Sequence, residues 1–364
     1  MFKSFAKIIT LITLITLISA CRQSAATAVP PTATIVPPPP TAAPPTVAPT
    51  PATADNQASR ATISANTVDQ IVQRQTLSGH SDLVYDLAFT PDARLLASGS
   101  VDGTIRLWDV AGGQAVHTLR HSGGVCRVAI SPDGALLASG GLNRTVKLWD
   151  LETGQVVHTF SGYDGAVCGL DFSPDGALLA TGSVDQSVKL WDVASGQLLH
   201  TLAGHTSAVF SVAFAPDGAW LASGSARPEL HIKLWDVESG QEVHILIGQE
   251  ADVHDLAFSP DGTLLAAVGP MAEVKLWNLA SGQVAHNLQG HNGNVFGTAF
   301  SADGTLLASS GDDGTLKLWD VATGRALHDL RHGGEGLTVA FAPDGSLLAY
   351  SGADNRVYLW GIPR

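Results

Sequence analysis

The sequence predicts an all-β fold, a closed β-propeller of seven four-stranded blades, on three observations. Similar segments follow one another seven times from Leu77 to the end of the chain. Each segment holds short apolar, β-prone runs separated by turn residues. Charged residues are sparse at 15%, and glycine occurs 38 times, which suits short strands joined by tight turns. One blade cannot bury both of its faces, so the blades must stack and close radially.

The repeat is marked by seven tryptophans with spacings of 41, 42, 44, 42, 42 and 41 residues: Trp108, Trp149, Trp191, Trp235, Trp277, Trp319 and Trp360. The first copy has Gly79-His80 near its start, the run Leu95 to Ser100, then Asp102-Gly103, and it closes on Trp108-Asp109. This pattern resembles the WD-repeat family, which has GH near the start and WD near the end of each repeat. The resemblance covers about 300 residues and implies one blade for each copy.

Turn residues separate the expected strands within each copy. Ser-Pro-Asp-Gly occurs at 131–134, 173–176 and 259–262, where proline fixes φ and glycine tolerates a positive φ. Asp102-Gly103 and Asp313-Gly314 mark a second hairpin. Segments such as Ala194-Ser195-Gly196-Gln197 mark a third turn, and three turns in each repeat predict four strands.

The two ends of the repeat array predict how the ring closes. Each copy is followed by an outer strand such as Gln114 to Leu119, but the last copy stops at Arg364 without one. The segment Ile71 to Leu77, ahead of the first GH, has the form of that missing strand. We therefore expect an N-terminal strand to complete the seventh blade, and a deletion of residues 67–77 to destabilise the whole domain.

The first residues have the features of an export signal. Lys3 and Lys7 precede an apolar stretch that is too short to span a bilayer, which is typical of a signal peptide. The stretch ends Leu17-Ile18-Ser19-Ala20-Cys21 and resembles the bacterial lipobox, although Ile18 departs from the small residue preferred there. That resemblance implies cleavage after residue 20 and lipidation of Cys21. Two or more acyl chains would hold the protein stably on a membrane.

A long segment of low complexity follows the expected anchor. Between residues 30 and 51 the chain is almost entirely Pro, Thr, Ala and Val, which predicts an extended spacer. At about 3.1 Å per residue, some 40 residues span up to roughly 120 Å. The expected organisation is a signal peptide over 1–20, a lipid-anchored Cys21 with a disordered linker over 21–66, and a propeller over 67–364. Either a passive tether or a stalk across a cell-wall layer fits this composition.

The charge balance restricts the partners. The chain has 20 Lys and Arg against 33 Asp and Glu, a formal net charge of −13. Such a field repels phosphate backbones, so we expect no nucleic-acid binding, and it disfavours membrane attachment through a basic patch.

Some polar residues of the repeats have the composition of a hydrolase triad. The resemblance to WD repeats implies a structural role instead: an indole donates to a hydroxyl, the hydroxyl to an imidazole, and the imidazole to a turn aspartate. The complete sets are His80, Ser98, Asp102 and Trp108, and His291, Ser309, Asp313 and Trp319. In the fifth copy Gln249, Ala267 and Met271 replace the other members and leave only Trp277, so we expect that blade to be the most labile.

Histidines and cysteines repeat without forming an evident metal site. Six histidines recur one to a blade on the expected outer strands: His117, His158, His200, His244, His286 and His328. Ligands spread around a rim cannot reach one ion, so we interpret them as solvated strand residues and expect no metal site. Cys126 and Cys168 occupy equivalent positions in adjacent copies. We expect buried free thiols there, with a disulfide as the alternative.

The resemblance also predicts a docking face around the channel entrance. In WD-repeat proteins, partners commonly contact residues three and five after the GH histidine and the residue before the turn aspartate. The corresponding candidates are Leu83, Tyr85, Val101, Phe210, Asp252, His254, Phe296, Asp312, Glu335 and Leu337. This face is expected to be apolar with aromatic anchors and an acidic sector, with Arg227 as its nearest basic residue. Such a surface suits a protein or peptide with apolar and basic side chains.

These features favour a non-catalytic, monomeric, extracytoplasmic propeller that binds proteins or peptides and needs no cofactor. A glycan or small-ligand sensor remains an alternative, as does a propeller hydrolase or lactonase with a site in the channel, because the fold hosts all three. The sequence leaves open whether the anchor lies in an inner or an outer membrane.

Overall fold

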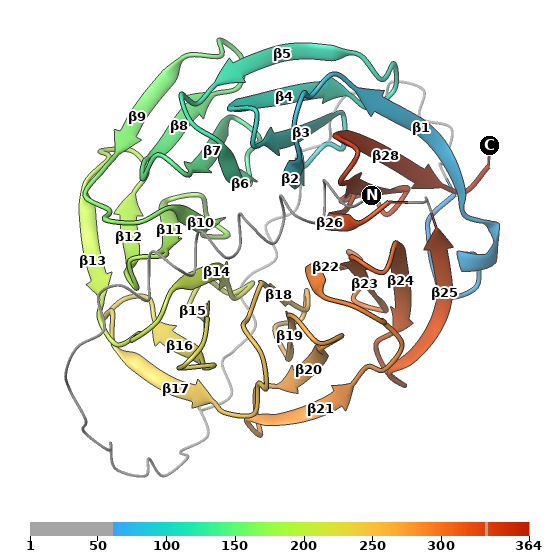
Figure 1. Ribbon diagram of the computed structural model, residues 1–364. Coiled ribbons are helices and arrows are strands. Elements are labelled where there is room, and N and C mark those ends of the chain that lie inside the picture. Colours follow the sequence, from blue (N-terminus) through green and yellow to red (C-terminus); the bar gives the residue numbers. More distant parts are fainter. Residues whose placement is uncertain (1–60, 332–333, 364) are drawn as a thin grey trace.

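The computed structural model describes residues 61–331 and 334–363. The expected leader, the expected lipidation site Cys21 and nearly all of the expected linker lie outside these residues. Within them, seven four-stranded antiparallel sheets surround a central channel (Figure 1). The described part contains no α-helix and one 3₁₀ turn, η1 (Val68–Gln70). None of its helices is long and apolar enough to cross a membrane.

Each blade runs from an inner strand at the channel to an outer strand at the rim. Blades 1 to 3 comprise β2 (Val84–Phe89), β3 (Leu95–Ser100), β4 (Thr104–Asp109) and β5 (Ala115–Arg120); β6 (Val125–Ile130), β7 (Leu136–Gly141), β8 (Val146–Asp150) and β9 (Val156–Phe160); and β10 (Val167–Phe172), β11 (Leu178–Ser183), β12 (Val188–Asp192) and β13 (Leu198–Leu202). Blades 4 and 5 comprise β14 (Val209–Phe214), β15 (Trp220–Ser225), β16 (Ile232–Asp236) and β17 (Glu242–Leu246); and β18 (Asp255–Phe258), β19 (Leu264–Val268), β20 (Val274–Asn278) and β21 (Gln283–Asn287). Blade 6 comprises β22 (Val295–Phe300), β23 (Leu306–Gly311), β24 (Thr315–Asp320) and β25 (Arg325–Arg331), and blade 7 comprises β26 (Gly336–Phe341), β27 (Leu347–Gly352), β28 (Arg356–Gly361) and β1 (Val72–Ser78).

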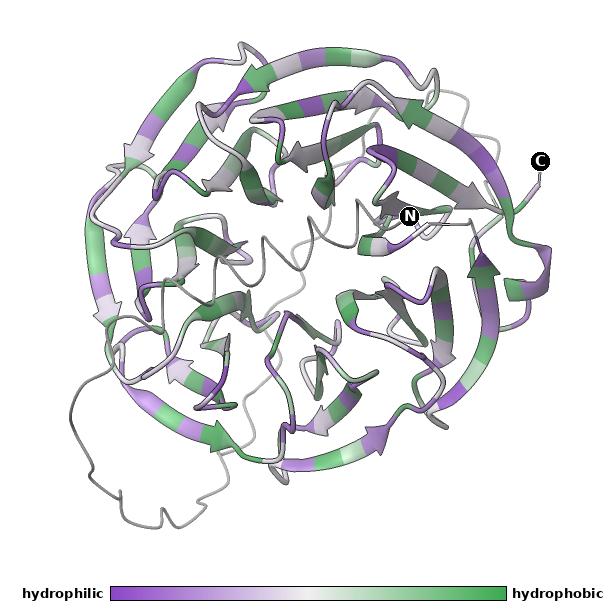
Figure 2. Cartoon of the chain, viewed as in Figure 1, coloured by the Kyte–Doolittle hydropathy of each residue, from purple (hydrophilic) through white to green (hydrophobic). Residues whose placement is uncertain are grey.

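The core lies between the blades. The tryptophan of one blade packs against the apolar strands of the blade before it, as Trp149 does against Ile105 and Leu107. Inner and middle strands are therefore mostly buried, whereas the outer strands are mostly exposed and carry both polar and apolar residues (Figure 2). Each blade supplies one wall of two cores, so no blade can bury its surface alone.

The Ser-Pro-Asp-Gly turns lie close to the neighbouring blade. In blade 2 the Ser131 hydroxyl and the Asp133 carboxylate accept from the N–H groups of Leu136 and Ala135, and Gly134 takes a φ of 74°. A Cβ on that glycine would lie 3.3 Å from Pro91 of blade 1. Glycine is favoured here by its positive φ, and the close approach of a proline leaves little room for a side chain.

The ring closes as the sequence predicts. Strand β1 pairs antiparallel with β28 and forms the outer edge of blade 7 (Figure 1). Val68 and Ile71 are buried with Tyr358 and Trp360 in a core shared by blades 6 and 7. Residues before the expected start at 67 also pack: Ile63 is 3% exposed, and its N–H donates to Gly345 O at 2.8 Å.

Candidate functional site

The polar sets of the repeats form the expected hydrogen-bond chains. In blade 1 the Trp108 indole donates to Ser98 Oγ (2.8 Å), the hydroxyl donates to His80 Nε2 (2.7 Å), and His80 Nδ1 donates to Asp102 (3.0 Å). The corresponding distances in the set from Trp319 through Ser309 and His291 to Asp313 are 2.8, 2.7 and 3.0 Å. Both serines are 0% exposed, so neither hydroxyl can reach a substrate.

The same chains fix the ionisation of their members. Burial lowers the pKa of His80, so the imidazole is neutral at pH 7. Burial opposes ionisation of Asp102, but hydrogen bonds from Thr104, the Ser81 N–H and His80 outweigh it and lower its pKa to about 2. Every group in the set is committed to an internal partner, which is a structural and not a catalytic arrangement.

Two blades depart from the expected pattern in ways that the sequence did not reveal. The fourth copy has His205, Ser223 and Trp235, but its turn is lengthened by Arg227-Pro228-Glu229 and has no aspartate at the expected position. In blade 4 Glu229 takes the place of that aspartate, binds His205 Nδ1 at 3.1 Å and completes the chain. In blade 5 our expectation that only Trp277 remains is wrong. With its amide nitrogen toward Glu273 (2.7 Å), the Gln249 side chain accepts from the Trp277 indole (3.3 Å). Glu229 and Glu273 both lie further along the chain than the position of the turn aspartate in the complete sets. A comparison of that position alone therefore does not find them.

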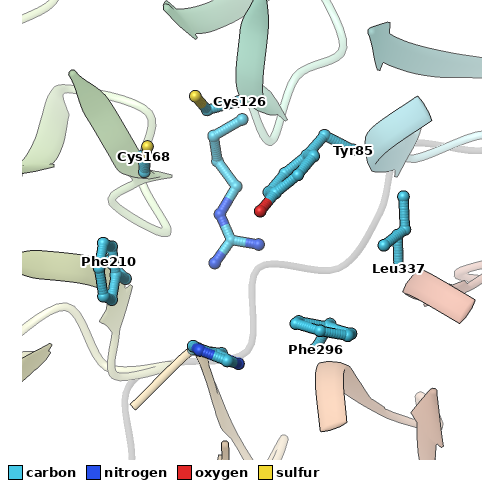
Figure 3. A pocket seen from close by; sticks show the side chains of 8 residues that line it. Tyr85, Cys126, Cys168, Phe210, Phe296 and Leu337 are labelled. Carbon is cyan, nitrogen blue, oxygen red and sulfur yellow. The ribbon is translucent and has the colours of Figure 1, made fainter. Parts of the chain in front are cut away.

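A pocket opens at the channel entrance and is built by one equivalent residue from each blade. In six of the seven inner strands the register shifts at this residue, and such a bulge re-aims a side chain. Figure 3 shows the labelled residues arranged around a common space. The contributing residues, in blade order, are Tyr85, Cys126, Cys168, Phe210, His254, Phe296 and Leu337.

The structure sorts the predicted docking residues into three groups. Tyr85, Phe210, His254, Phe296 and Leu337 line the pocket. Leu83 is 3% exposed and packs with Val101 behind Leu337 and Phe296, so these two residues support the wall. The three acids are not among the lining residues: Asp252 binds Arg227, Asp312 binds Asn294, and Glu335 precedes the inner strand of blade 7.

The expectation that Arg227 is the nearest basic residue is wrong, because Arg127 also lines the pocket. Its Nη2 donates to Asp255 (2.5 Å) and to Ser211 (3.1 Å), and its Nη1 lies 3.6 Å from Asp86. These partners belong to blades 5, 4 and 1, whereas Arg127 belongs to blade 2. The side chain therefore crosses the channel and joins four blades.

Arg127, Asp86, Ser211 and Asp255 form the Arg127 cluster, and burial shifts the pKa values of Arg127 and Asp86. Burial raises the pKa of Asp86 to about 6, although Arg127 and the Val128 N–H favour the carboxylate. Burial also disfavours the guanidinium, but Asp255 and Asp86 outweigh that effect and raise the pKa of Arg127. The sequence contains a pattern that indicates this cluster. One residue directly after the pocket residue of its repeat contributes to the cluster from each of four blades: Asp86, Arg127, Ser211 and Asp255.

The pocket is small. The cavity volume open to the centres of water molecules is about 50 Å³. Since one water needs about 10–15 Å³ by that measure, the pocket holds a few waters or the end of one side chain. That size is far below the volume of ordinary small-molecule sites.

Two of the pocket residues are cysteines. Cys126 and Cys168 are buried and free, and a hydrogen bond with Cys168 together with burial raises the pKa of the Cys126 thiol.

The six histidines of the outer strands are less solvated than expected: His117 is exposed, but the other five are partly buried. His158, for example, lies 3.3 Å from Ala194 O of the next blade. Within the described residues, no three His, Cys, Asp or Glu side chains are grouped to hold a metal ion.

Fold and site together define a seven-bladed propeller with a side-chain-sized pocket at its channel entrance. The family model for the WD domain, G-beta repeat, matches residues 71–109, 113–150, 154–192, 196–236, 240–278, 282–320 and 326–361. The chain belongs to this WD-repeat family.

The chain is also similar to short stretches of several curated proteins. It is 49% identical over 57 residues to ribosome biogenesis protein BOP1 of Rattus norvegicus and 50% identical over 46 residues to small ribosomal subunit protein RACK1 of Medicago sativa. A striatin homolog of Dictyostelium discoideum is 35% identical over 54 residues. The matches cover 16%, 13% and 15% of this chain and 8%, 14% and 6% of the relatives, respectively. These similarities extend over little more than one repeat each.

Proposed function

We propose that this protein is a non-catalytic scaffold, anchored by a lipid outside the cytoplasm, that binds a protein or peptide at the channel entrance. The observation that carries the proposal is the pocket itself. Seven blades each turn one side chain into it, and Tyr85, Phe210 and Phe296 supply aromatic groups. Aromatic side chains in desolvated pockets provide much of the binding energy at protein interfaces.

The polar groups of the described residues that resemble a catalytic set are hydrogen-bonded to one another, which favours a binding role over a catalytic role. The Ser, His and Asp sets are buried and satisfied internally, and Arg127 is neutralised by two carboxylates beneath the pocket. The small volume of the pocket also disfavours a glycan or a drug-sized ligand as its occupant. A side chain projecting from a larger partner fits this space better.

The membrane attachment is proposed from the N-terminal sequence. A short apolar leader ending at Cys21 favours lipidation, and the Pro-rich segment favours a spacer between anchor and propeller. We expect Cys21→Ala to release the protein from the membrane fraction of the source cells, whereas wild type sediments with it. Equal sedimentation of both proteins, with no acyl mass on Cys21, would refute the anchor.

The binding proposal is tested by cross-linking capture in the source cells. We expect Tyr85→Ala/Phe210→Ala/Phe296→Ala to lose a specific protein that wild type recovers. Val116→Ala/Val156→Ala/Leu198→Ala is the matched control, because its residues lie exposed on the outer strands of three blades. The control should recover that protein at wild-type yield. Equal recovery by the pocket variant and wild type, with both folded, would place binding elsewhere.

A further inference from the structure

His254 occupies an unusual place in the pocket wall. Its ring stacks on Phe296 with centroids 5.2 Å apart and an interplanar angle of 9°, and it meets Phe210 edge-on at 6.2 Å. Its Nδ1 lies 3.2 Å from the carbonyl oxygen of Val295. A carbonyl only accepts, so Nδ1 carries the proton and Nε2 presents a lone pair.

That lone pair has no partner within residues 61–331 and 334–363, although Nε2 is buried. Leaving a buried acceptor unpaired destabilises the protein, because the acceptor has lost its hydrogen bonds to water and gained none. Burial also lowers the pKa of His254, so the ring stays neutral at pH 7 and Nε2 remains an acceptor. A ligand that donates a hydrogen bond would satisfy it.

The carboxylates of Asp252 and Asp255 act on the His254 ring, and their negative charge favours a donor that is also a cation. Two further acids lie on blades 6 and 7. Asp312 accepts from the Asn294 N–H and side-chain amide, and Asn294 adjoins the Val295 carbonyl that binds His254. Burial raises the pKa of Asp312. Burial also raises the pKa of Glu335, and the negative charge of the neighbouring Asp312 adds to that effect. Glu335 Oε2 is a second buried acceptor with no hydrogen bond to any described residue.

The positive charge of Arg127, which lines the pocket, does not reverse the preference for a cationic ligand. Arg127 contributes one positive charge, which Asp86 and Asp255 more than offset. Asp312 and Glu335 add further negative charge on blades 6 and 7 when they are ionised. A positive ligand would favour their ionised forms, which burial alone disfavours.

We propose that the pocket takes a cationic side chain, lysine or arginine, projecting from the bound partner; this proposal rests on the proposed function. The cationic N–H group donates to His254 Nε2 and lies in the negative field of the acids around the pocket, of which Asp252 and Asp255 act most directly on the His254 ring. Its alkyl stem packs on Phe210 and Phe296, where long basic side chains gain apolar contact. The cavity volume of about 50 Å³ accommodates the end of one such side chain.

The test uses the full-length protein and blocked tripeptides Gly-X-Gly, with X as Lys, Arg, Gln, Tyr or norleucine. Binding is followed by the ¹⁵N NMR signal of the His254 Nε2 atom and by titration at low salt. We expect the Lys or the Arg peptide to move that signal and to bind at least ten-fold more tightly than the Gln, Tyr and norleucine peptides. Comparison of the Lys and Arg arms identifies which cation the pocket prefers.

Two variants link the binding to the site. His254→Phe keeps an aromatic ring but removes the acceptor, and Glu335→Gln removes a charge without touching the wall. Each should weaken the cationic peptide at least five-fold, whereas His117→Phe on the exposed rim should leave it unchanged. Equal binding of neutral and cationic peptides, no binding at 10 mM, or insensitivity to both variants would overturn the proposal.

The outcome can be separated from that of the proposed function. If capture identifies a partner whose residue at the pocket is neither lysine nor arginine, this inference fails and the scaffold stands. If capture shows no partner at the channel entrance but the cationic peptide binds as expected, the pocket chemistry stands and the scaffold fails.

Discussion

At the residue scale, the polar groups of the repeats were predictable where each member stood at its expected position. The sets of His80 and His291 follow from the sequence because four residue types recur at fixed spacing. Arg127 escaped prediction because its partners come from three other blades, and sequence spacing does not show which side chains meet across a channel. Glu229 escaped because it completes its chain from a longer turn.

The Arg127 cluster yields a stability prediction. Arg127→Met leaves two buried carboxylates without their cation, a change that costs about 3–5 kcal/mol of unfolding free energy for a buried pair. Arg120→Met, at the exposed end of β5, should cost less than about 0.5 kcal/mol. Urea denaturation at pH 7 measures both. A loss below 1 kcal/mol for Arg127→Met would show that the cluster does not hold the blades together.

The same variant should change how stability depends on pH. Asp86 already has a folded-state pKa of about 6, above its unfolded value near 3.8. Such a carboxyl stabilises the fold fully below pH 4 and loses that contribution as the pH rises through its folded-state pKa. Without the guanidinium that pKa rises further. The unfolding free energy of Arg127→Met should therefore fall more steeply between pH 5 and 8 than that of wild type, and parallel curves would contradict this.

At the scale of the element, the strands and hairpins followed from short apolar, β-prone runs and the turn residues between them, and the N-terminal strand followed from the missing last strand. The register shifts that build the pocket were not predictable, because no residue type is common to the six positions at which they occur. The resemblance to WD repeats supplied these positions, and the structure supplied the reason they converge.

Blade 5 remains the blade that we expect to be most labile. Its inner strand β18 has four residues, against six in β22 of blade 6. The turn between β19 and β20 places two non-glycine residues, Met271 and Ala272, at positive φ. Such backbone costs on the order of 1 kcal/mol or more per residue. Amides of β18 and β19 should exchange with deuterium faster than those of β22 and β23, and equal protection would refute this expectation.

At the scale of the whole molecule, the ring is closed by a strand from the far end of the chain. Deleting residues 67–77 removes β1 and the buried Val68, Ile71 and Leu77, and it exposes the edge of β28. We expect the melting temperature to fall by more than about 10 °C, since closure holds every blade interface. Deleting residues 41–51 of the Pro-rich segment is the length-matched control and should leave it unchanged. An unchanged melting temperature in the 67–77 deletion would contradict the closure.

The central claim is that a partner binds at the channel entrance, and site-specific photo-cross-linking tests it most directly. A photo-reactive amino acid replaces Phe296 in the pocket or, in a second strain, the exposed Val116 on the outer strand of blade 1. We predict that the probe at 296 cross-links one defined protein in the source cells and that the probe at 116 does not. A protein cross-linked equally from both positions, or only from 116, would contradict the claim.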